Sequence, residues 1–222
     1  MYEIKNSKEV NLSDQIRFRC MRCAECCRHV EASIMIEVKD AFYIAKHLGI
    51  TVAEFYDKYT EMFMLEDTGF PIFAIKTIGK EKSCIFLKGK HCSIQTVKPR
   101  TCRLYPFWVF PEDDGTFVYN YSTERRHHPK GTLIRVKDWM KDFLSDEDKE
   151  YLLEEARSIK QIAVPYKILC ATLRDQENIL AKVLMYRYFM YDTSEPFIQQ
   201  FYRNNRVLQD DLERIIKKFT SV

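Results

Sequence analysis

The stretch Phe18-Arg-Cys20-Met-Arg-Cys23-Ala-Glu-Cys26-Cys27 holds four of the chain's eight cysteines. A Cys-x2-Cys pair lets two thiolates reach one cation while the backbone between them turns, and zinc and iron–sulfur sites both use it. Here the pair is extended to Cys-x2-Cys-x2-Cys-Cys. The pattern predicts a metal site held by thiolates, around which the front of the chain folds.

The adjacent pair Cys26 and Cys27 limits how one ion can be held. Neighbouring side chains point about 100° apart in a helix and to opposite faces in a strand. We therefore expect these two side chains to diverge rather than to serve one mononuclear ion side by side. Two neighbouring sites and one polynuclear cluster are the alternatives.

A second cysteine block follows in the same half, and Gly89 within it favours a turn between Cys84 and Cys92. Seven thiols fill one four-cysteine site and leave three for a second, which then needs a bridging thiolate, a histidine or an open coordination position. The predicted metal ligands are Cys20, Cys23, Cys26, Cys27, Cys84, Cys92 and Cys102.

Four thiolates around Zn²⁺ or a [4Fe–4S] core leave a net charge of about −2, which is costly to bury alone. Basic residues flank nearly every predicted ligand, and we take Arg100 and Arg103 as the candidates for binding the cofactor. The alternative for each is a solvated surface cation. The flanking set is Arg19, Arg22, Arg28, Lys98, Arg100 and Arg103.

Composition narrows the class of protein. The net charge of +3, from 35 basic and 32 acidic residues, argues against a nucleic-acid partner and against a polybasic membrane surface. The opening sequence MYEIKNSKEVNL has no apolar signal region, and no segment is apolar for long enough to span a bilayer. We expect a cytoplasmic protein with reduced thiols rather than a disulfide framework.

The cysteines also divide the chain. We predict a cysteine-cluster metal-binding domain over about residues 1–125 and a helical extension over about 140–222, joined by a polar connection at 123–131. The expected fold class is α+β and mostly helical. Short strands accompany the metal-binding domain, and a helical hairpin or bundle follows it.

Start and stop signals place the elements. We expect a helix at 39–48 that ends at Gly49, a second that opens with a capping box at Thr51, and strands at 70–77 and 116–121. In the back half, Ser145 caps a helix to about residue 160. Pro165 begins another with the stripe Leu169, Leu173, Gln176, Leu180, Val183 and Leu184, and a last helix begins at 194–196.

Four ordered blocks resemble the YkgJ-type cysteine-cluster family. They are the cysteine motif at 20–27, Leu-Gly-Ile-Thr at 48–51 ahead of Glu-Phe-Tyr-Asp-Lys-Tyr, Cys-Ile-Phe-Leu at 84–87, and Arg-Thr-Cys-Arg-Leu-Tyr-Pro-Phe at 100–107. The resemblance covers about residues 15–110 and implies binding of zinc, iron or an iron–sulfur cluster. Ala24 stands where the family commonly has glycine, and Ile85 where it commonly has proline. Neither departure removes a ligand.

Residues outside this pattern have simpler interpretations. Cys170, on a predicted helix, is expected to be a buried structural thiol. The aromatic run at 186–191 is expected to pack in the core. The pair His127-His128 beside two arginines is an alternative anion or metal site, and His91 and His29 are weaker candidates.

Three classes of function follow. The first is a metal-binding protein that holds an iron–sulfur cluster, [4Fe–4S] for example, or zinc, with a role in redox chemistry, maturation or sensing. The second is a cluster-containing enzyme, by analogy with flagellin lysine N-methylases, which carry a related cysteine cluster. The third is a structural zinc domain that presents the helical half to a protein partner. We expect the first, with iron–sulfur favoured because Cys26 and Cys27 should diverge; the sequence assigns no catalytic residue.

Overall fold

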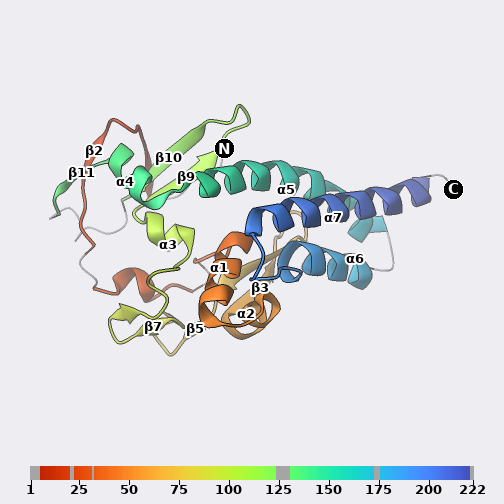
Figure 1. The fold of residues 1–222 in the computed structure, drawn as a ribbon, viewed down its shortest axis with the longest axis horizontal. Helices are drawn as coiled ribbons and strands as arrows, with labels where there is room; N and C mark the ends of the chain where they lie inside the picture. Colours follow the sequence, from red (N-terminus) through yellow and green to blue (C-terminus); the bar gives the residue numbers. More distant parts are fainter. Residues whose placement is uncertain (1–5, 21–22, 32, 124–130, 173–175, 221–222) are drawn as a thin grey trace.

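The computed structural model describes residues 6–20, 23–31, 33–123, 131–172 and 176–220. Figure 1 shows most strands and short helices on the left of the molecule and long helices that run to the C-terminus on the right. The expected α+β class, mostly helical, is confirmed. No helix in the described part of the chain is long and apolar enough to cross a membrane.

The front half is built from short antiparallel pairings rather than one large sheet. Within the described residues, its only three-stranded sheet has the order β1-β10-β9. The strands of the front half and the connection are β1 (Ser7–Val10), β2 (Gln15–Arg17), β3 (Thr60–Met64), β4 (Pro71–Ile75), β5 (Thr77–Ile78), β6 (Ser83–Cys84), β7 (Leu87–Lys88), β8 (His91–Cys92), β9 (Phe107–Pro111), β10 (Phe117–Ser122) and β11 (Leu133–Arg135). The remaining pairs are β2–β11, β3–β4, β5–β6 and β7–β8.

Two helices of the front half follow their local signals. Helix α1 (Val38–Leu48) ends at Gly49, which has a φ of 67° and closes the last turn with its N–H. Helix α2 (Val52–Tyr59) opens with both hydrogen bonds of the capping box between Thr51 and Glu54. Both predictions are confirmed, and the two helices pack against each other.

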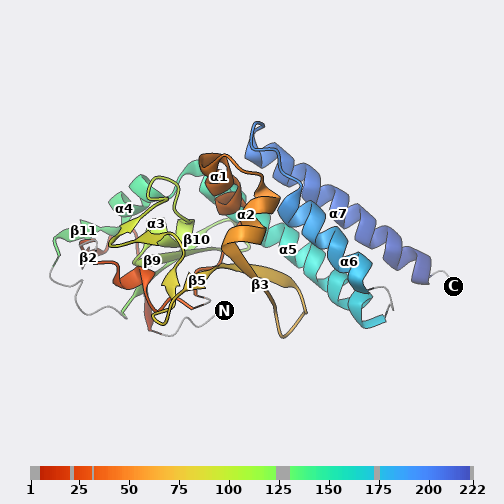
Figure 2. The same ribbon diagram turned by 90° about the horizontal axis from the view of Figure 1, so that it is seen from below.

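The back half is a bundle of long helices. After α4 (Val136–Phe143) come α5 (Asp146–Thr172), α6 (Gln176–Val183), the π-helical segment η3 (Leu184–Phe189) and α7 (Phe197–Thr220). Helix α5 packs against both α6 and α7, and Figures 1 and 2 show the three helices side by side. The predicted helical hairpin or bundle is confirmed.

The prediction that Pro165 begins a new helix is wrong. Residues 146–172 form one helix with Pro165 inside it. The buried face runs from Ile162 before the proline to Tyr166 and Leu169 after it. Packing of this face therefore outweighs the hydrogen bond that proline cannot donate. The predicted stripe is instead divided among α5, α6 and η3, and Leu173 lies outside the described residues.

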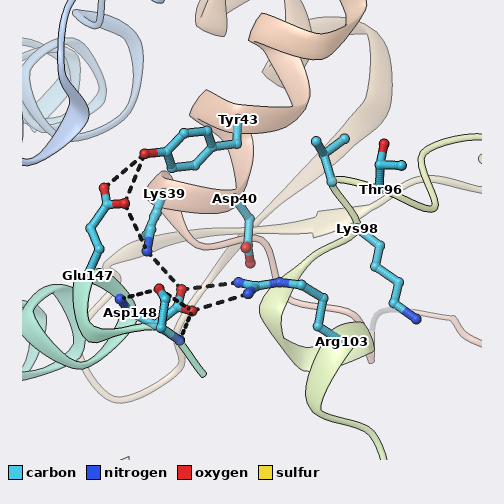
Figure 3. A pocket seen from close by; sticks show the side chains of 10 residues that line it. Lys39, Asp40, Tyr43, Thr96, Lys98, Arg103, Glu147 and Asp148 are labelled. Carbon is cyan, nitrogen blue, oxygen red and sulfur yellow. Dashed lines mark hydrogen bonds and ion pairs between the residues drawn. The ribbon is translucent and has the colours of Figure 1, made fainter. Parts of the chain in front are cut away.

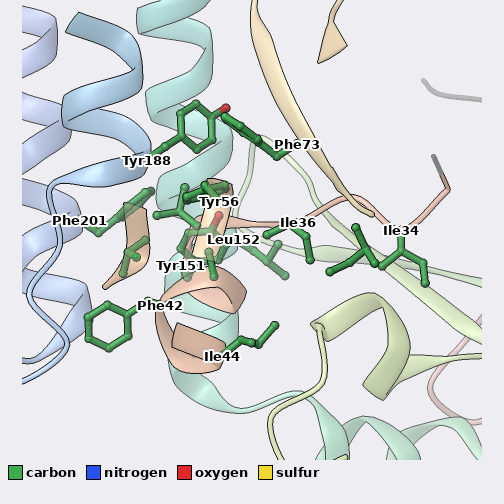
Figure 4. Packing of buried hydrophobic residues seen from close by; sticks show 14 of the residues in the cluster. Ile34, Ile36, Phe42, Ile44, Tyr56, Phe73, Tyr151, Leu152, Tyr188 and Phe201 are labelled. Carbon is green, nitrogen blue, oxygen red and sulfur yellow. The ribbon is translucent and has the colours of Figure 1, made fainter. Parts of the chain in front are cut away.

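One hydrophobic core runs through both halves. Phe42 of α1 packs on Phe197 of α7, with ring centroids 5.3 Å apart. Tyr56 of α2 and Phe73 of β4 both contact Tyr188 of η3 (Figure 4). The boundaries 1–125 and 140–222 stay a prediction, and the shared core joins the two segments into one folded unit.

Replacing Pro165 by alanine should raise the free energy of unfolding by about 1–3 kcal/mol, because alanine restores the missing helical hydrogen bond at that position. Chemical denaturation of the variant and the parent measures the change. The matched control is Lys167→Ala on an exposed position of the same helix, which should change stability by no more than about 0.5 kcal/mol. A Pro165→Ala protein no more stable than the parent would contradict the prediction.

Candidate metal centre

The cysteine motif folds as a tight turn. Ala24 adopts the left-handed conformation with a φ of 64°, and Glu25–Cys27 forms one 3-10 turn, η1. The N–H of Cys27 donates to the carbonyl oxygen of Ala24 at 3.0 Å. Left-handed backbone favours glycine, so the geometry explains why glycine is common at this position of the resembling family.

The expectation that Cys26 and Cys27 diverge is wrong. Their sulfur atoms lie 3.9 Å apart. Two thiolates on a tetrahedral zinc ion, each at about 2.3 Å, are separated by about 3.8 Å. The tight turn therefore brings the neighbouring side chains together, whereas an α-helix or a strand would have separated them.

The second cysteine block reaches the same region from two hairpins and a helix. Cys84 lies in β6, Cys92 in β8, and Cys102 in α3 (Arg100–Leu104). Strands β7 and β8 pair with Leu87 opposite Cys92, and Gly89 in the turn has a φ of 61°. The turn predicted between Cys84 and Cys92 is confirmed.

Electrostatic coupling shows which thiols lie near one another. The pKa of Cys27 is raised by its hydrogen bond with Cys26, by burial, and by the nearby Cys102 and Cys84. Burial raises the pKa of Cys102, and Cys84 and Cys26 raise it further. Burial also raises the pKa values of Cys84 and Cys92, and each is raised again by Cys26. We call these five residues the thiol cluster: Cys26, Cys27, Cys84, Cys92 and Cys102.

The donor set of the thiol cluster fits a metal ion or an iron–sulfur cluster. Its sulfurs come from four segments of the chain, and thiolates are the ligands that both groups take. Without a cation, burial and neighbouring thiols raise the pKa values of Cys27, Cys84, Cys92 and Cys102, and a bound cation offsets both effects. Among the described residues, no three Cys, His, Asp or Glu side chains are arranged so that they could hold a metal ion together.

The thiol cluster lies close to the molecular surface. Cys26 is exposed and Cys84 is buried, while Cys27, Cys92 and Cys102 are half-buried. One side of the centre therefore faces solvent and the other faces the core.

The remaining cysteines, Cys20, Cys23 and Cys170, are not members of the thiol cluster. Cys20 is exposed just after β2, and Cys23 is half-buried just before Ala24. The ligand role of these two stays a prediction. Cys170 is half-buried on α5 and shares a hydrogen bond with Tyr166.

The flanking cations have carboxylate partners. Arg100 donates from Nε to Glu37 at 2.9 Å and also bonds the other oxygen of that carboxylate through Nη2. Arg103 forms a bidentate pair with Asp148, both bonds at 3.1 Å. The structure thus holds both guanidinium groups in ion pairs, and their role toward a cofactor stays a prediction.

Other basic candidates vary in their surroundings. Arg28 lies 3.6 Å from Glu81, and Arg19 is exposed. Lys98 is half-buried and electrostatically lowers the otherwise raised pKa values of Cys92 and Cys102. Among the described residues, Lys98 is thus a flanking cation that lies near the thiol cluster. Arg22, His127 and His128 lie outside the described residues.

A cavity of about 240 Å³ adjoins this region (Figure 3). Lys39 on its wall donates to Asp148 at 2.8 Å, and Tyr43 donates to Glu147. Asp40 accepts a hydrogen bond from the backbone N–H of Arg100 through Oδ1. Burial and the neighbouring Glu37 raise the pKa of Asp40 to about 7 against the lowering effect of the arginines.

Comparison with known proteins now identifies the family. A family model described as "Putative zinc- or iron-chelating domain", CxxCxxCC, matches residues 19–131. The chain belongs to the CxxCxxCC family. The match confirms the resemblance to YkgJ-type proteins and supports metal binding by the front half.

One relative is similar in sequence to part of this CxxCxxCC chain. The uncharacterized protein MJ0661 of Methanocaldococcus jannaschii is 34% identical over 96 residues, which are 42% of this chain and 47% of the relative. The chain therefore spans about half the length of the curated relative it matches. No solved structure matches the chain.

The roles of several residues that position the CxxCxxCC site could not be predicted from the sequence. Gly131 is one: a Cβ there would lie 2.4 Å from the backbone N of Arg19 and from the backbone C of Phe18. The glycine thus lets the connection lie against the segment that leads into Cys20. Buried charges were also missed, because an isolated Lys or Asp looks like a surface residue: Lys39, Asp40 and Asp148.

Replacing Gly131 by alanine should lower the free energy of unfolding by about 2 kcal/mol, because the backbone before Cys20 must shift to admit the methyl group. Denaturation of the two proteins measures this. Gly89→Ala is the control: no atom lies within 4 Å of its added Cβ, so only the cost of its positive φ remains, about 1 kcal/mol. Equal losses in the two variants would contradict the close approach as the cause.

Proposed function

We propose that the front half holds an iron–sulfur cluster through cysteine thiolates, in a protein that acts in redox chemistry, maturation or sensing. The observation that carries the proposal is the thiol cluster, which gathers cysteines of η1, β6, β8 and α3 and has the Cys26 and Cys27 sulfurs 3.9 Å apart. The family description supports metal binding, and an iron–sulfur cluster is the finer assignment that we add.

Two features favour an iron–sulfur cluster over a closed zinc site. The thiol cluster contains five sulfurs, with two further cysteines in the same motif, whereas a closed zinc site takes four ligands. Exposed Cys26 also places one edge of the centre at the surface, where a partner can exchange electrons with it. When bound, an iron–sulfur cluster supplies a redox centre tuned by charge, hydrogen bonds and exposure.

Structural zinc is the second candidate, and one observation favours it. The 3.9 Å separation of the Cys26 and Cys27 sulfurs is close to the edge of a tetrahedral zinc site, and it removes the divergence that argued against zinc. In that case the helical half would serve a protein partner.

The chain's own residues have distinct tasks in either case. The thiols of the cluster bind the metal once deprotonated, and Lys98 offsets part of the negative charge that follows. The paired carboxylates Glu37 and Asp148 hold Arg100 and Arg103, on either side of Cys102 in α3. Cys102 is therefore positioned by a network that does not depend on the metal.

Spectroscopy of anaerobically purified protein tests the assignment of the metal. We expect a brown protein with broad absorption near about 400 nm that bleaches on reduction, and with iron and acid-labile sulfide in it. Iron, sulfide and zinc analysis on the same sample gives the stoichiometry. A colourless protein that carries one equivalent of zinc and no sulfide would overturn the iron–sulfur assignment and support structural zinc.

Serine substitutions test the ligand set. Cys84→Ser, Cys92→Ser and Cys102→Ser should each lower bound metal by at least half, since each removes one thiolate from the thiol cluster. Cys170→Ser is the matched control on α5 and should keep full metal content.

Elemental analysis of each purified variant gives the metal content, and circular dichroism shows whether the variant is folded. A folded Cys102→Ser protein with full metal content would remove Cys102 from the site.

A further inference from the structure

A group of polar side-chain atoms is buried where α2 and the helical bundle meet. Each of these atoms is shielded from solvent and has no hydrogen-bond partner among the described protein atoms. They come from α2, α5, η3 and α7. We call them the buried polar group: Tyr56 Oη, Tyr151 Oη, Glu155 Oε2, Arg187 Nε and Asn205 Nδ2.

Arg187 is the centre of this group. Its guanidinium pairs with Oε1 of Glu155 and reaches Oδ1 of Asn205 at 3.4 Å. It also lies over the ring of Phe70, 5.7 Å from the centroid. Tyr56 packs edge-on against Tyr188, the neighbour of Arg187, with ring centroids 5.5 Å apart, and Tyr151 lies one helical turn before Glu155 on α5. Four of the unpartnered atoms therefore lie around the side chain that carries the fifth, Arg187 Nε.

An unusual backbone places Arg187 here. Residues 184–189 form a π-helix, and the N–H of Met190 donates to the carbonyl oxygen of Met185, five residues earlier. A π turn is wider than an α turn and is found mostly as single turns, frequently at functional sites. The wider turn directs Arg187 and Tyr188, both buried, into the core between α2 and α5.

Leaving so many buried polar atoms without partners is costly. A buried donor or acceptor that loses water and gains no replacement forfeits the whole of its hydration. Native structures leave few such atoms, and internal water usually supplies the missing hydrogen bonds. Four of them around the unpartnered Nε of one guanidinium indicate a ligand rather than a packing defect.

We propose that the buried polar group is a binding site for ordered internal water. Water accepts hydrogen bonds from Arg187 Nε and Asn205 Nδ2 and donates to Glu155 Oε2, and the hydroxyls of Tyr56 and Tyr151 complete the network. Two to four polar partners for each molecule is what internal water needs. The site lies outside the thiol cluster and does not depend on the metal that the cluster binds.

The charges and the burial favour water over a larger ligand or an ion. Glu155 already neutralises Arg187, so an added ion would have no counter-charge. Tyr56, Tyr151 and Asn205 are each no more than 2% exposed. A site so enclosed and so nearly neutral suits small neutral molecules that enter with local opening.

The water network would link the two halves of the chain. Tyr56 belongs to α2 of the front half, and the other members belong to the helical bundle. Hydrogen bonds through water are nearly as favourable as direct ones. The site therefore adds a polar connection to the hydrophobic core that joins α2 to α5, η3 and α7.

Magnetic relaxation dispersion of ²H and ¹⁷O in the full-length protein tests the proposal directly. Internal water that exchanges slowly gives a dispersion, and we expect Tyr151→Phe and Asn205→Leu each to reduce its amplitude by at least one water molecule. Tyr59→Phe, on a half-buried residue outside the group, is the control and should leave the amplitude unchanged. Native mass spectrometry of the same sample detects any retained organic molecule.

Thermal melts give a second readout. Tyr151→Phe should lower the Tm by about 2–4 °C, as should Tyr188→Phe, which removes a hydroxyl bonded to the Pro71 carbonyl at 2.6 Å. An unchanged or higher Tm for Tyr151→Phe would show a hydroxyl without a water partner and overturn the proposal. An unchanged dispersion in both folded variants, or a retained organic molecule displaced by them, would also overturn it.

Discussion

Asp148, in the first turn of α5, connects three separate helices through one buried carboxylate. It accepts hydrogen bonds from Lys39 of α1 and from Arg103 of α3, and its Oδ2 also accepts one from the backbone N–H of Ser145. Burial alone would raise the pKa of Asp148, but Arg103 and Lys39 outweigh it and hold the pKa well below its usual value. Removing one partner of such a buried pair costs about 3–5 kcal/mol, because the remaining charge is left unpaired.

The metal centre depends on that carboxylate through α3. This helix is only five residues long and carries Cys102 between Arg100 and Arg103. A helix so short is not stable by itself, so its orientation comes from the ion pairs of the two arginines. The hairpins that bring Cys84 and Cys92 are two-residue pairings, which are also marginal alone. These ion pairs hold α3 and Cys102 in place, and a metal bound by the thiols would tie the two hairpins to α3.

Local signals in the sequence predicted the local structure well. Gly49 ends α1, Thr51 opens α2 and Ser145 opens α5, because a cap depends on residues three or four positions away. The errors concern properties set by distant contacts. Pro165 lies inside α5 because residues after it continue to pack on the core. The few residues around the proline do not indicate that distant packing.

The region of the candidate site was predictable from the sequence, and its geometry was less so. The cysteine spacing pointed to the region that the family match covers, but the convergence of Cys26 and Cys27 depends on the left-handed Ala24 before them. The arginines were predicted as cations for the cofactor, and the structure gives them Glu37 and Asp148, which lie far away in the sequence. Sequence spacing carries no signal for such pairs.

Asp40 links the ion network to the thiols. Its carboxylate accepts the backbone N–H of Arg100 and raises the pKa of Cys102, so it lies between the two systems. Because its own pKa in the folded protein, about 7, is above the usual value of 3.8, the folded state binds this proton more tightly than the unfolded chain. Its contribution to stability is therefore present at low pH and is lost as the pH rises from about 4 to about 7. A negative charge on Cys102 would strengthen that proton binding, and a cation on the thiols would weaken it, so the charge state of the metal centre acts on the carboxylate network that positions Cys102.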